Sequence, residues 1–108
     1  MSGSGLGEFE QLVLLAILQL EDQASAAGIR RQLEHSAGRR VSRGALYATL
    51  DRLETKGFLG WAVQPGSPGG GVPPRRFQVT RRGIAALRRS WGALHRLGQG
   101  LERLLDPA

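Results

Sequence analysis

The chain has 108 residues, 41% of them hydrophobic and 22% charged, which suffices for one soluble domain with a modest core. It has no cysteine, so disulfides and thiolate metal sites are excluded. Fourteen arginines and one lysine oppose nine acids, and the net charge of +6 favours a phosphate-bearing partner, most often nucleic acid. Arginine-rich, glycine-rich and alanine-rich chains also come from GC-rich genomes, so charge alone leaves this partner open.

The amino-terminal region shows no sign of export or of insertion into a membrane. Its longest apolar run, 12–18, is too short to span a bilayer. Glu8 and Glu10 precede this run without any basic residue, which is the reverse of a secretory signal. We therefore expect a cytoplasmic protein that makes no membrane contact.

Apolar spacing predicts two helices in the first third of the chain. Residues 1–6 are too rich in glycine and serine to order by themselves, and we expect disorder there. From Glu8 onward apolar residues recur at the i, i+3, i+4 spacing of one helix face. Asp22 and Gln23 indicate a break, and Asp22 is a candidate cap for a second helix over 24–36. Gly38 is expected to end that helix.

The third helix has the clearest boundaries. Ser42 is its expected N-cap, the helix covers 43–56, and Gly57 follows at a position where helices end. Three leucines form a narrow apolar stripe along it, which we assign to the core: Leu46, Leu50 and Leu53.

A β-hairpin is expected next. Residues 58–64 alternate as a strand does, and residues 75–79 form a second strand. Between them the segment 65–74, PGSPGGGVPP, can form neither a helix nor a paired strand. The hairpin over 59–79 therefore has a long tip, with Arg75 and Arg76 at its base.

Thr80 is the expected cap of a last helix over 81–105, which a short tail at 106–108 follows. Apolar residues recur in this helix at alternating steps of three and four, as in the seam between two helices, with one interruption at Gly98. Two short helices and a hairpin cannot cover so long a helix, so its second half is expected to pack on another copy of the chain. The seam comprises Ile84, Leu87, Trp91, Leu94, Gly98, Leu101 and Leu105.

The order of elements predicts a mainly α fold with a small β-hairpin (α+β). It is a winged helix-turn-helix domain over 7–80, followed by a long C-terminal dimerisation helix. In this fold the third helix lies in the major groove of DNA, and the hairpin, or wing, reaches the backbone or the minor groove. Arginines there can bind base edges or phosphates, small residues let the helix approach the duplex, and a tyrosine hydroxyl can donate to a phosphate. The expected DNA-binding residues are Arg39, Arg40, Ser42, Arg43, Gly44, Tyr47, Ala48, Arg75 and Arg76.

Three segments carry a resemblance to a known family: VSRGALYATLDRLETKGFL (41–59), GEFEQLVLLAIL (7–18) and RRFQVTRRGIAAL (75–87). Together they resemble the PadR family of winged-helix transcriptional regulators, over about residues 7–105. The resemblance implies a homodimeric regulator, usually a repressor, that dimerises through its first and last helices. It also implies that six residues face DNA, namely Ser42, Arg43, Gly44, Tyr47 and Ala48 in the recognition helix and Arg75 in the wing.

The chain departs from the family pattern at three places, one of which is a wing tip unusually rich in glycine and proline. Ser25 and Ala26 stand where the second helix of the family commonly has a Tyr-Gly pair. Arg76 replaces the first of two adjacent aromatic residues in the wing. These departures leave the fold prediction intact but blur the operator preference and the wing contacts.

The seam and the resemblance together predict a dimer interface. Trp91 has two interpretations in it: it is interface core, or it stacks a planar aromatic effector, as a tryptophan on the last helix does in some family members. A small aromatic effector between the subunits is therefore left open. The expected interface residues are Phe9, Leu12, Leu87, Trp91, Leu94, Leu101 and Leu105.

The sequence contains no catalytic constellation. His35 and His95 are far apart, and the glycine-rich wing tip lacks the lysine and the strand-to-helix context of a P-loop. We expect no enzyme activity, no cofactor and no metal. The sequence favours a regulator that binds a pseudo-palindrome in double-stranded DNA, its two recognition helices about one helical turn apart. The alternative is a winged-helix adaptor that binds protein and not DNA, which would expose an apolar patch on its third helix.

Overall fold

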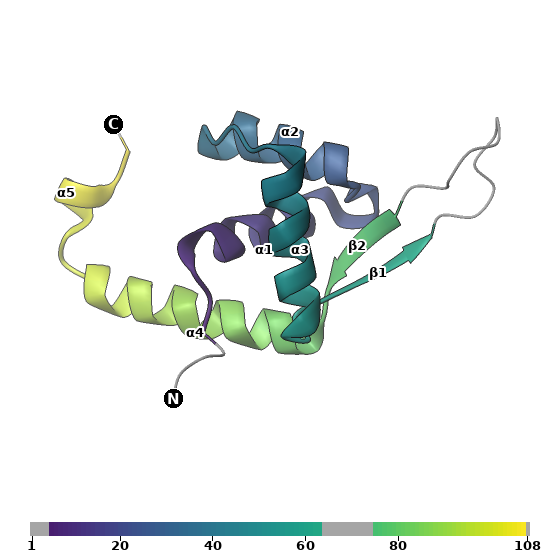
Figure 1. Cartoon of the computed structure of the whole chain (residues 1–108). Coiled ribbons are helices and arrows are strands. Elements are labelled where there is room, and N and C mark those ends of the chain that lie inside the picture. The colour runs from purple at the N-terminus through teal and green to yellow at the C-terminus, as the bar shows by residue number, and fades with distance from the viewer. Residues whose placement is uncertain (1–4, 64–74, 108) are drawn as a thin grey trace.

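A computed structural model of the chain describes residues 5–63 and 75–107 (Figure 1). Within these ranges the elements follow the predicted order, and the winged helix-turn-helix fold is confirmed. Residues 1–4 of the expected disordered start, the last residue of the expected strand over 58–64, the whole wing tip at 65–74, and Ala108 of the tail lie outside the described residues. The elements are α1 (Glu8–Leu20), the 3-10 turn η1 (Glu21–Gln23), α2 (Ala26–Ala37), α3 (Arg43–Thr55), β1 (Leu59–Val63), β2 (Arg75–Val79), α4 (Arg81–Gly98) and α5 (Glu102–Leu105).

Three of the helices begin at a hydroxyl side chain that accepts a hydrogen bond from the backbone of the first turn. Ser42 caps α3 and Thr80 caps α4, both as predicted. The prediction for α2 was wrong, because Ser25 caps this helix and Asp22 lies in η1. Ala24 cannot be helical because its carbonyl accepts the N–H of Phe77 at 2.9 Å, which joins this segment to β2.

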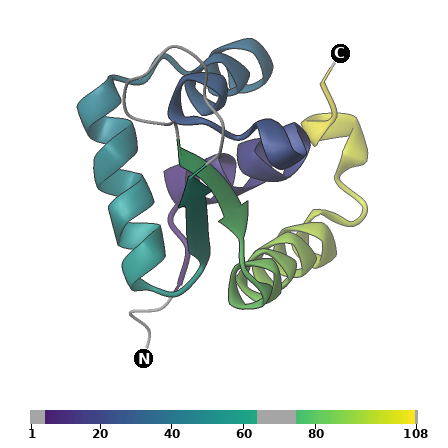
Figure 2. The ribbon, with the colours of Figure 1, turned by 90° about the vertical axis from the view of Figure 1, so that its right-hand side faces the viewer.

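The two strands pair antiparallel, with Leu59 opposite Val79 and Trp61 opposite Phe77. Figure 2 shows this hairpin between α3 and α4. Phe77 is buried while Trp61 is 41% exposed, so the same face of the hairpin is core at one strand and solvent at the other. The base of the wing is therefore anchored in the core, and its outer half stands clear of it.

The core fills the space enclosed by α1, α2, α3, the hairpin and the start of α4. The predicted leucine stripe of α3 is confirmed, since all three leucines are at most 2% exposed. Burial of each such side chain contributes about 1.5–3 kcal/mol, so the stripe fixes α3 firmly on the domain. The large core side chains are Val13, Leu14, Ile17, Ile29, Leu33, Leu46, Leu50, Leu53, Phe58, Leu59, Phe77 and Leu87.

The start of α4 is pressed against the base of the wing. Thr80 donates its hydroxyl to the carbonyl of Gly57 at 2.6 Å and its N–H to that of Phe58 at 3.0 Å. A Cβ at Gly83 would lie 2.4 Å from the carbonyl oxygen of Phe58, so no larger residue fits there without moving the helix. The wing and α4 are consequently rigidly joined.

The last helix is shorter than predicted. The expected helix over 81–105 ends at Gly98, and Gly100 adopts a φ of 85°, which turns the chain before the short α5. Glycines at 98 and 100 favour this break because they stabilise a helix poorly and adopt positive φ at little cost. Figure 1 shows α4 extending past the core and α5 turned away from its axis. No helix in the described ranges is long and apolar enough to cross a membrane.

Candidate nucleic-acid interface

A cleft of about 560 Å³ opens between the start of α2, the first turns of α3 and the base of β2. Four arginines from three different elements line it: Arg30 from α2, Arg43 from α3, and Arg75 and Arg76 from β2. No carboxylate is among the described residues that line it. Like charges that converge without a counter-charge favour a polyanion that lies across all of them.

The first turns of α3 present a narrow exposed face beside this cleft. Arg43, Gly44 and Ala48 are exposed, and the hydroxyl of Ser42 accepts the N–H of Ala45 at 3.1 Å as the helix cap. Apart from its chain neighbours and the backbone of its own helix, a Cβ at Gly44 would meet no described atom within 4 Å. The fold therefore gives no packing reason for a glycine there, whereas a duplex approaching the helix backbone would.

Arg75 is held against aromatic rings at the mouth of the cleft. Its guanidinium carbon lies 4.9 Å from the ring centroid of Trp61, 5.6 Å from Tyr47 and 5.8 Å from Phe77. Trp61 in turn donates its indole N–H to Glu54 of α3 at 3.2 Å. Each cation–π contact contributes about 0.5–1 kcal/mol at an exposed site, so the wing and the recognition helix are bridged by this cluster.

Two residues at this cleft, Arg30 and Trp61, were not among the predicted DNA-binding residues. Arg30 also donates Nε–H to the carbonyl of Val41 at 3.0 Å, which ties α2 to the turn before α3. The apolar spacing of α2 does not indicate which neighbour an exposed arginine on this helix contacts. The bond from Trp61 to Glu54 likewise joins two side chains that no local sequence pattern relates.

The structure separates two predicted DNA-binding residues from the cleft. Arg39 forms an ion pair with Glu8 and lies over the ring of Phe9 at 5.8 Å, so it faces α1. Arg40 is 91% exposed and lies 3.5 Å from a carboxylate oxygen of Glu34. Neither residue lines the cleft. The structure thus brings together Arg43, Tyr47, Arg75 and Arg76 but not the pair that precedes α3.

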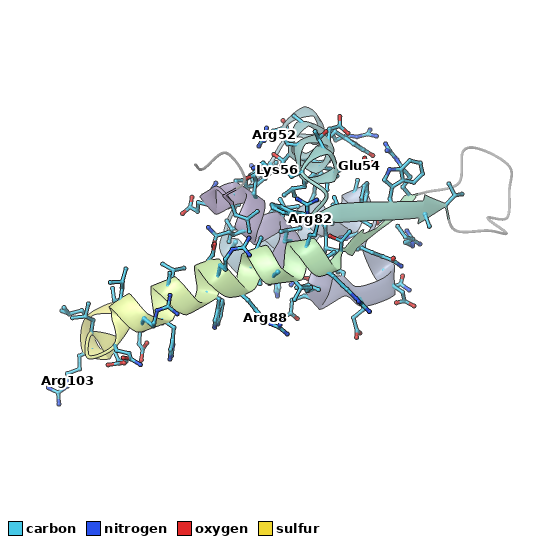
Figure 3. All side chains as sticks on the ribbon, turned by 90° about the horizontal axis from the view of Figure 1, so that it is seen from below. Arg52, Glu54, Lys56, Arg82, Arg88 and Arg103 are labelled. Atoms are coloured by element: carbon cyan, nitrogen blue, oxygen red, sulfur yellow. The ribbon has the colours of Figure 1, made fainter. Side chains whose placement is uncertain are left out.

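Glu10 is the one buried carboxylate among the described residues, and it lies at the opposite end of α3. Burial is the largest single effect and raises the pKa of Glu10, but the opposing effects together outweigh it and leave the pKa below its ordinary value of 4.5. These effects are the hydrogen bond from the Gly7 N–H at 2.8 Å, the hydrogen bonds and charge of Lys56, and a hydrogen bond from Arg52. Figure 3 shows Arg52 and Lys56 on this side of α3, whereas Glu54 points toward the wing.

The predicted interface residues divide into buried and exposed groups. Leu87 is only 8% exposed and belongs to the core of its own chain, so little of its surface is left for a partner. Phe9 and Leu12 of α1 are half-buried against the core. The remaining predicted residues are exposed, together with two leucines that the seam omitted. This exposed apolar arm comprises Trp91 at 66%, Leu94 at 66%, Leu97 at 80%, Leu101 at 43%, Leu104 at 80% and Leu105 at 65%.

Other groups on the surface carry no comparable arrangement. Arg88 and Arg103 point into solvent from α4 and α5 (Figure 3). A shallow hollow of about 560 Å³ lies where α4 meets α5, lined by Trp91, Leu94, His95 and Leu105 among others. In the part of the chain that the structure describes, no group of three histidine or acidic residues could hold a metal ion.

Comparisons with known proteins agree with this geometry. A family model described as transcriptional regulator PadR-like family matches residues 14–89. A PadR family regulator from Eggerthella lenta is 27% identical, with a TM-score of 0.65 over 94% of this chain and 88% of that one. A PadR-like transcription factor from Bacteroides fragilis (23% identical, TM-score 0.68, covering 89% and 88%) and a PadR-like regulator from Bacillus cereus (19%, 0.70, 93% and 93%) share the fold. A search of curated proteins found no match.

Proposed function

The chain belongs to the PadR-like family of transcriptional regulators, and from this premise we propose that it binds specific sequences in double-stranded DNA as a homodimer and represses transcription. Members of this family are transcriptional regulators and not enzymes. The family match covers α2, α3, the hairpin and the first half of α4, which are the elements that form the arginine cleft.

The observation that carries the proposal is the cleft with its four arginines and its lack of carboxylates. In a winged helix the start of the third helix enters the major groove and the wing follows the backbone. Arg43 stands at that start, so we assign it to base edges. Arg75 stands at the base of the wing, so we assign it to a phosphate.

Smaller residues complete the proposed contact surface. Gly44 and Ala48 let the backbone of α3 lie close to the duplex, and the hydroxyl of Tyr47 donates to a phosphate. Ser42 caps the helix, whose positive end also favours a phosphate. Arg40 supplies long-range attraction from the turn before α3 and no directed contact.

The apolar arm of α4 and α5 supports a homodimer. Trp91 and five leucines form a larger exposed apolar surface than a monomer in water readily tolerates. Packing this arm on a second copy, beside Phe9 and Leu12 of α1, buries it. A two-fold dimer sets two recognition helices about one turn of DNA apart and matches a pseudo-palindromic site.

The hollow beside Trp91 supports a second, narrower proposal. Its indole is exposed, and leucines and His95 surround it, which suits a planar aromatic effector between the subunits. Such a ligand would alter the angle between the two copies and hence the separation of the recognition helices.

The adaptor alternative finds less support in the geometry. It would need an apolar patch on α3, but the leucines of α3 are buried and its exposed residues are charged, polar or small. An acidic protein partner for the cleft would have to match four converging arginines, which a DNA backbone does by its regular charge.

The test is binding of the purified chain to its own upstream promoter DNA and to a scrambled duplex across a salt series. We expect a preference for the promoter that survives moderate salt. Equal binding to both duplexes, with steep salt dependence, would mean non-specific association. An absence of binding to either duplex at low salt would favour the adaptor.

A further inference from the structure

The first turn of α1 contacts the turn between α2 and the recognition helix, and it also contacts the far end of the recognition helix. Glu8 and Phe9 hold Arg39, which lies in the turn just before α3. The next residue, Glu10, holds Arg52 and Lys56 at the far end of α3. Three consecutive residues of one helix thus bracket another helix that lies more than thirty positions further along the chain.

The contact at Glu10 is the stronger of the two. Its side chain is 6% exposed, and Lys56 Nζ lies 3.0 Å from Oε1 and 2.9 Å from Oε2. Arg52 Nε lies 3.4 Å from Oε2, and Lys56 Nζ also donates to the carbonyl of Gly5 at 3.0 Å. Glu8 is 80% exposed, so its ion pair with Arg39 is largely screened by water.

The two kinds of contact on α3 do different things. The leucine stripe determines which face of α3 is buried, but burial of apolar area is not directional and leaves small rotations and axial shifts to be fixed by other contacts. Charged hydrogen bonds to a buried carboxylate are directional and short. They fix the rotation and the axial position of the helix, on which the placement of Arg43 in a groove depends.

We propose that the first turn of α1 is a clamp that positions the recognition helix, with Glu10 as its central positioning residue. The inference rests on the proposed function, because a specific DNA site is what the positioned helix reads. α1 also packs against α2 and α4. In the proposed dimer the clamp therefore links α3 to the helices that pair the two copies.

Glu10 has a second effect on DNA binding. It holds Arg52 and Lys56, the basic residues at the end of the recognition helix, on the side that faces α1. Without its charge Lys56 is released to contact any phosphate. Loss of Glu10 should therefore weaken binding to the specific site while leaving non-specific binding unchanged or stronger.

The test is Glu10→Gln, which keeps the size of the side chain and its reach to the Gly7 N–H. The DNA is the strongest duplex obtained by in vitro selection with the wild-type chain, a scrambled duplex, and duplexes with the half-sites moved by one base pair. We expect the ratio of specific to non-specific affinity to fall by about tenfold, and the penalty for altered spacing to shrink.

The control for a general loss of stability is Ile29→Val, a core substitution on α2 away from the cluster. If Glu10→Gln lowers the melting temperature as this control does and keeps wild-type preference for site and spacing, the clamp is overturned. If the wild-type chain itself selects no sequence, the proposed function fails, which is a different result.

Lys56→Met is a second variant that tests the clamp if Glu10→Gln does not fold. Methionine retains most of the apolar stem of the lysine side chain and removes its charge. It should reproduce the loss of preference. The double variant should lose no more than either single variant, since both remove the same link. Losses that simply add would overturn the assignment of Glu10 as the residue that acts through Lys56.

Discussion

The two ends of α3 carry basic residues in opposite surroundings. At the first turn Arg43 is exposed, and the described residues that line its cleft include three further arginines and no carboxylate. At the last turns Arg52 and Lys56 lie against the buried Glu10. The comparison teaches that a basic residue on a recognition helix is available to DNA only where no carboxylate of the same chain has already bound it.

The largest expected effect on DNA affinity comes from removing Arg43, the exposed arginine at the first turn of α3. Arg43→Ala should weaken binding to the selected site by about 1–3 kcal/mol and change non-specific binding much less. Fluorescence anisotropy with selected and scrambled duplexes measures both affinities. Arg43→Lys is the matched control that keeps the charge. An equal loss on every sequence would reduce Arg43 to a phosphate contact.

The next largest effect is expected at Arg75, the wing arginine that stacks on aromatic rings. Arg75→Lys keeps the charge but loses the planar guanidinium that stacks on Trp61, Tyr47 and Phe77. We expect about tenfold weaker binding on all sequences, since the wing is proposed to contact phosphate. A lysine variant that binds as wild type in the same titration would show that stacking plays no part.

Gly44 should show opposite effects on stability and binding. Gly44→Ala should raise the unfolding free energy by about 0.5–1 kcal/mol, because alanine stabilises a helix and its Cβ meets open space. The same methyl group should weaken DNA binding by severalfold. Thermal unfolding and anisotropy measure the two effects. A stabilised variant with unchanged affinity would mean that DNA does not approach this turn.

Acid should remove the contribution of ionised Glu10 to the unfolding free energy. The pKa of Glu10 is lower in the folded chain than its unfolded value near 4.5, so the stability it contributes is fully present above that value. It is lost as the pH falls through the folded pKa. Urea unfolding of wild type and Glu10→Gln from pH 7 to pH 3 should show a constant gap that narrows below about pH 4.5. A gap that is independent of pH would contradict the charge of Glu10 as its cause.

The smallest effect is expected at Arg52. Arg52→Ala leaves Lys56 on Glu10 and removes a side chain that is 56% exposed. We expect a change below about 0.5 kcal/mol in unfolding and no change in affinity for the selected site. A tenfold loss of affinity would show that the far end of α3 also contacts DNA. It would contradict the distinction between a DNA-binding first turn and last turns that are bound within the chain.

Local patterns were sufficient to predict much of the fold. The leucine stripe of α3, the caps at Ser42 and Thr80 and the stop at Gly38 depend on neighbours within one helical turn, and all are confirmed. The start of α2 was missed because Ala24 is held by a bond to Phe77, more than fifty residues away. The end of the last helix was missed because the apolar seam outweighed the glycines at 98 and 100.

Most residues of the candidate site could be predicted from the sequence, whereas the ion pairs between distant segments could not. Arg43, Tyr47 and Arg75 were expected and meet in one cleft. That Arg39 faces Glu8 and that Lys56 faces Glu10 follows only from how α1 crosses α3 in three dimensions. Charge pairing between distant segments has no period in the sequence, so spacing could not reveal which basic residues are bound within the chain.

The most direct test of the account is a crystal structure of the chain with the duplex that it selects. We expect two copies on one pseudo-palindrome, with Arg43 within hydrogen-bond distance of base edges in the major groove and Lys56 still on Glu10. A duplex bound on another face, or one that contacts Arg52 and Lys56 while Arg43 stays in solvent, would contradict the account.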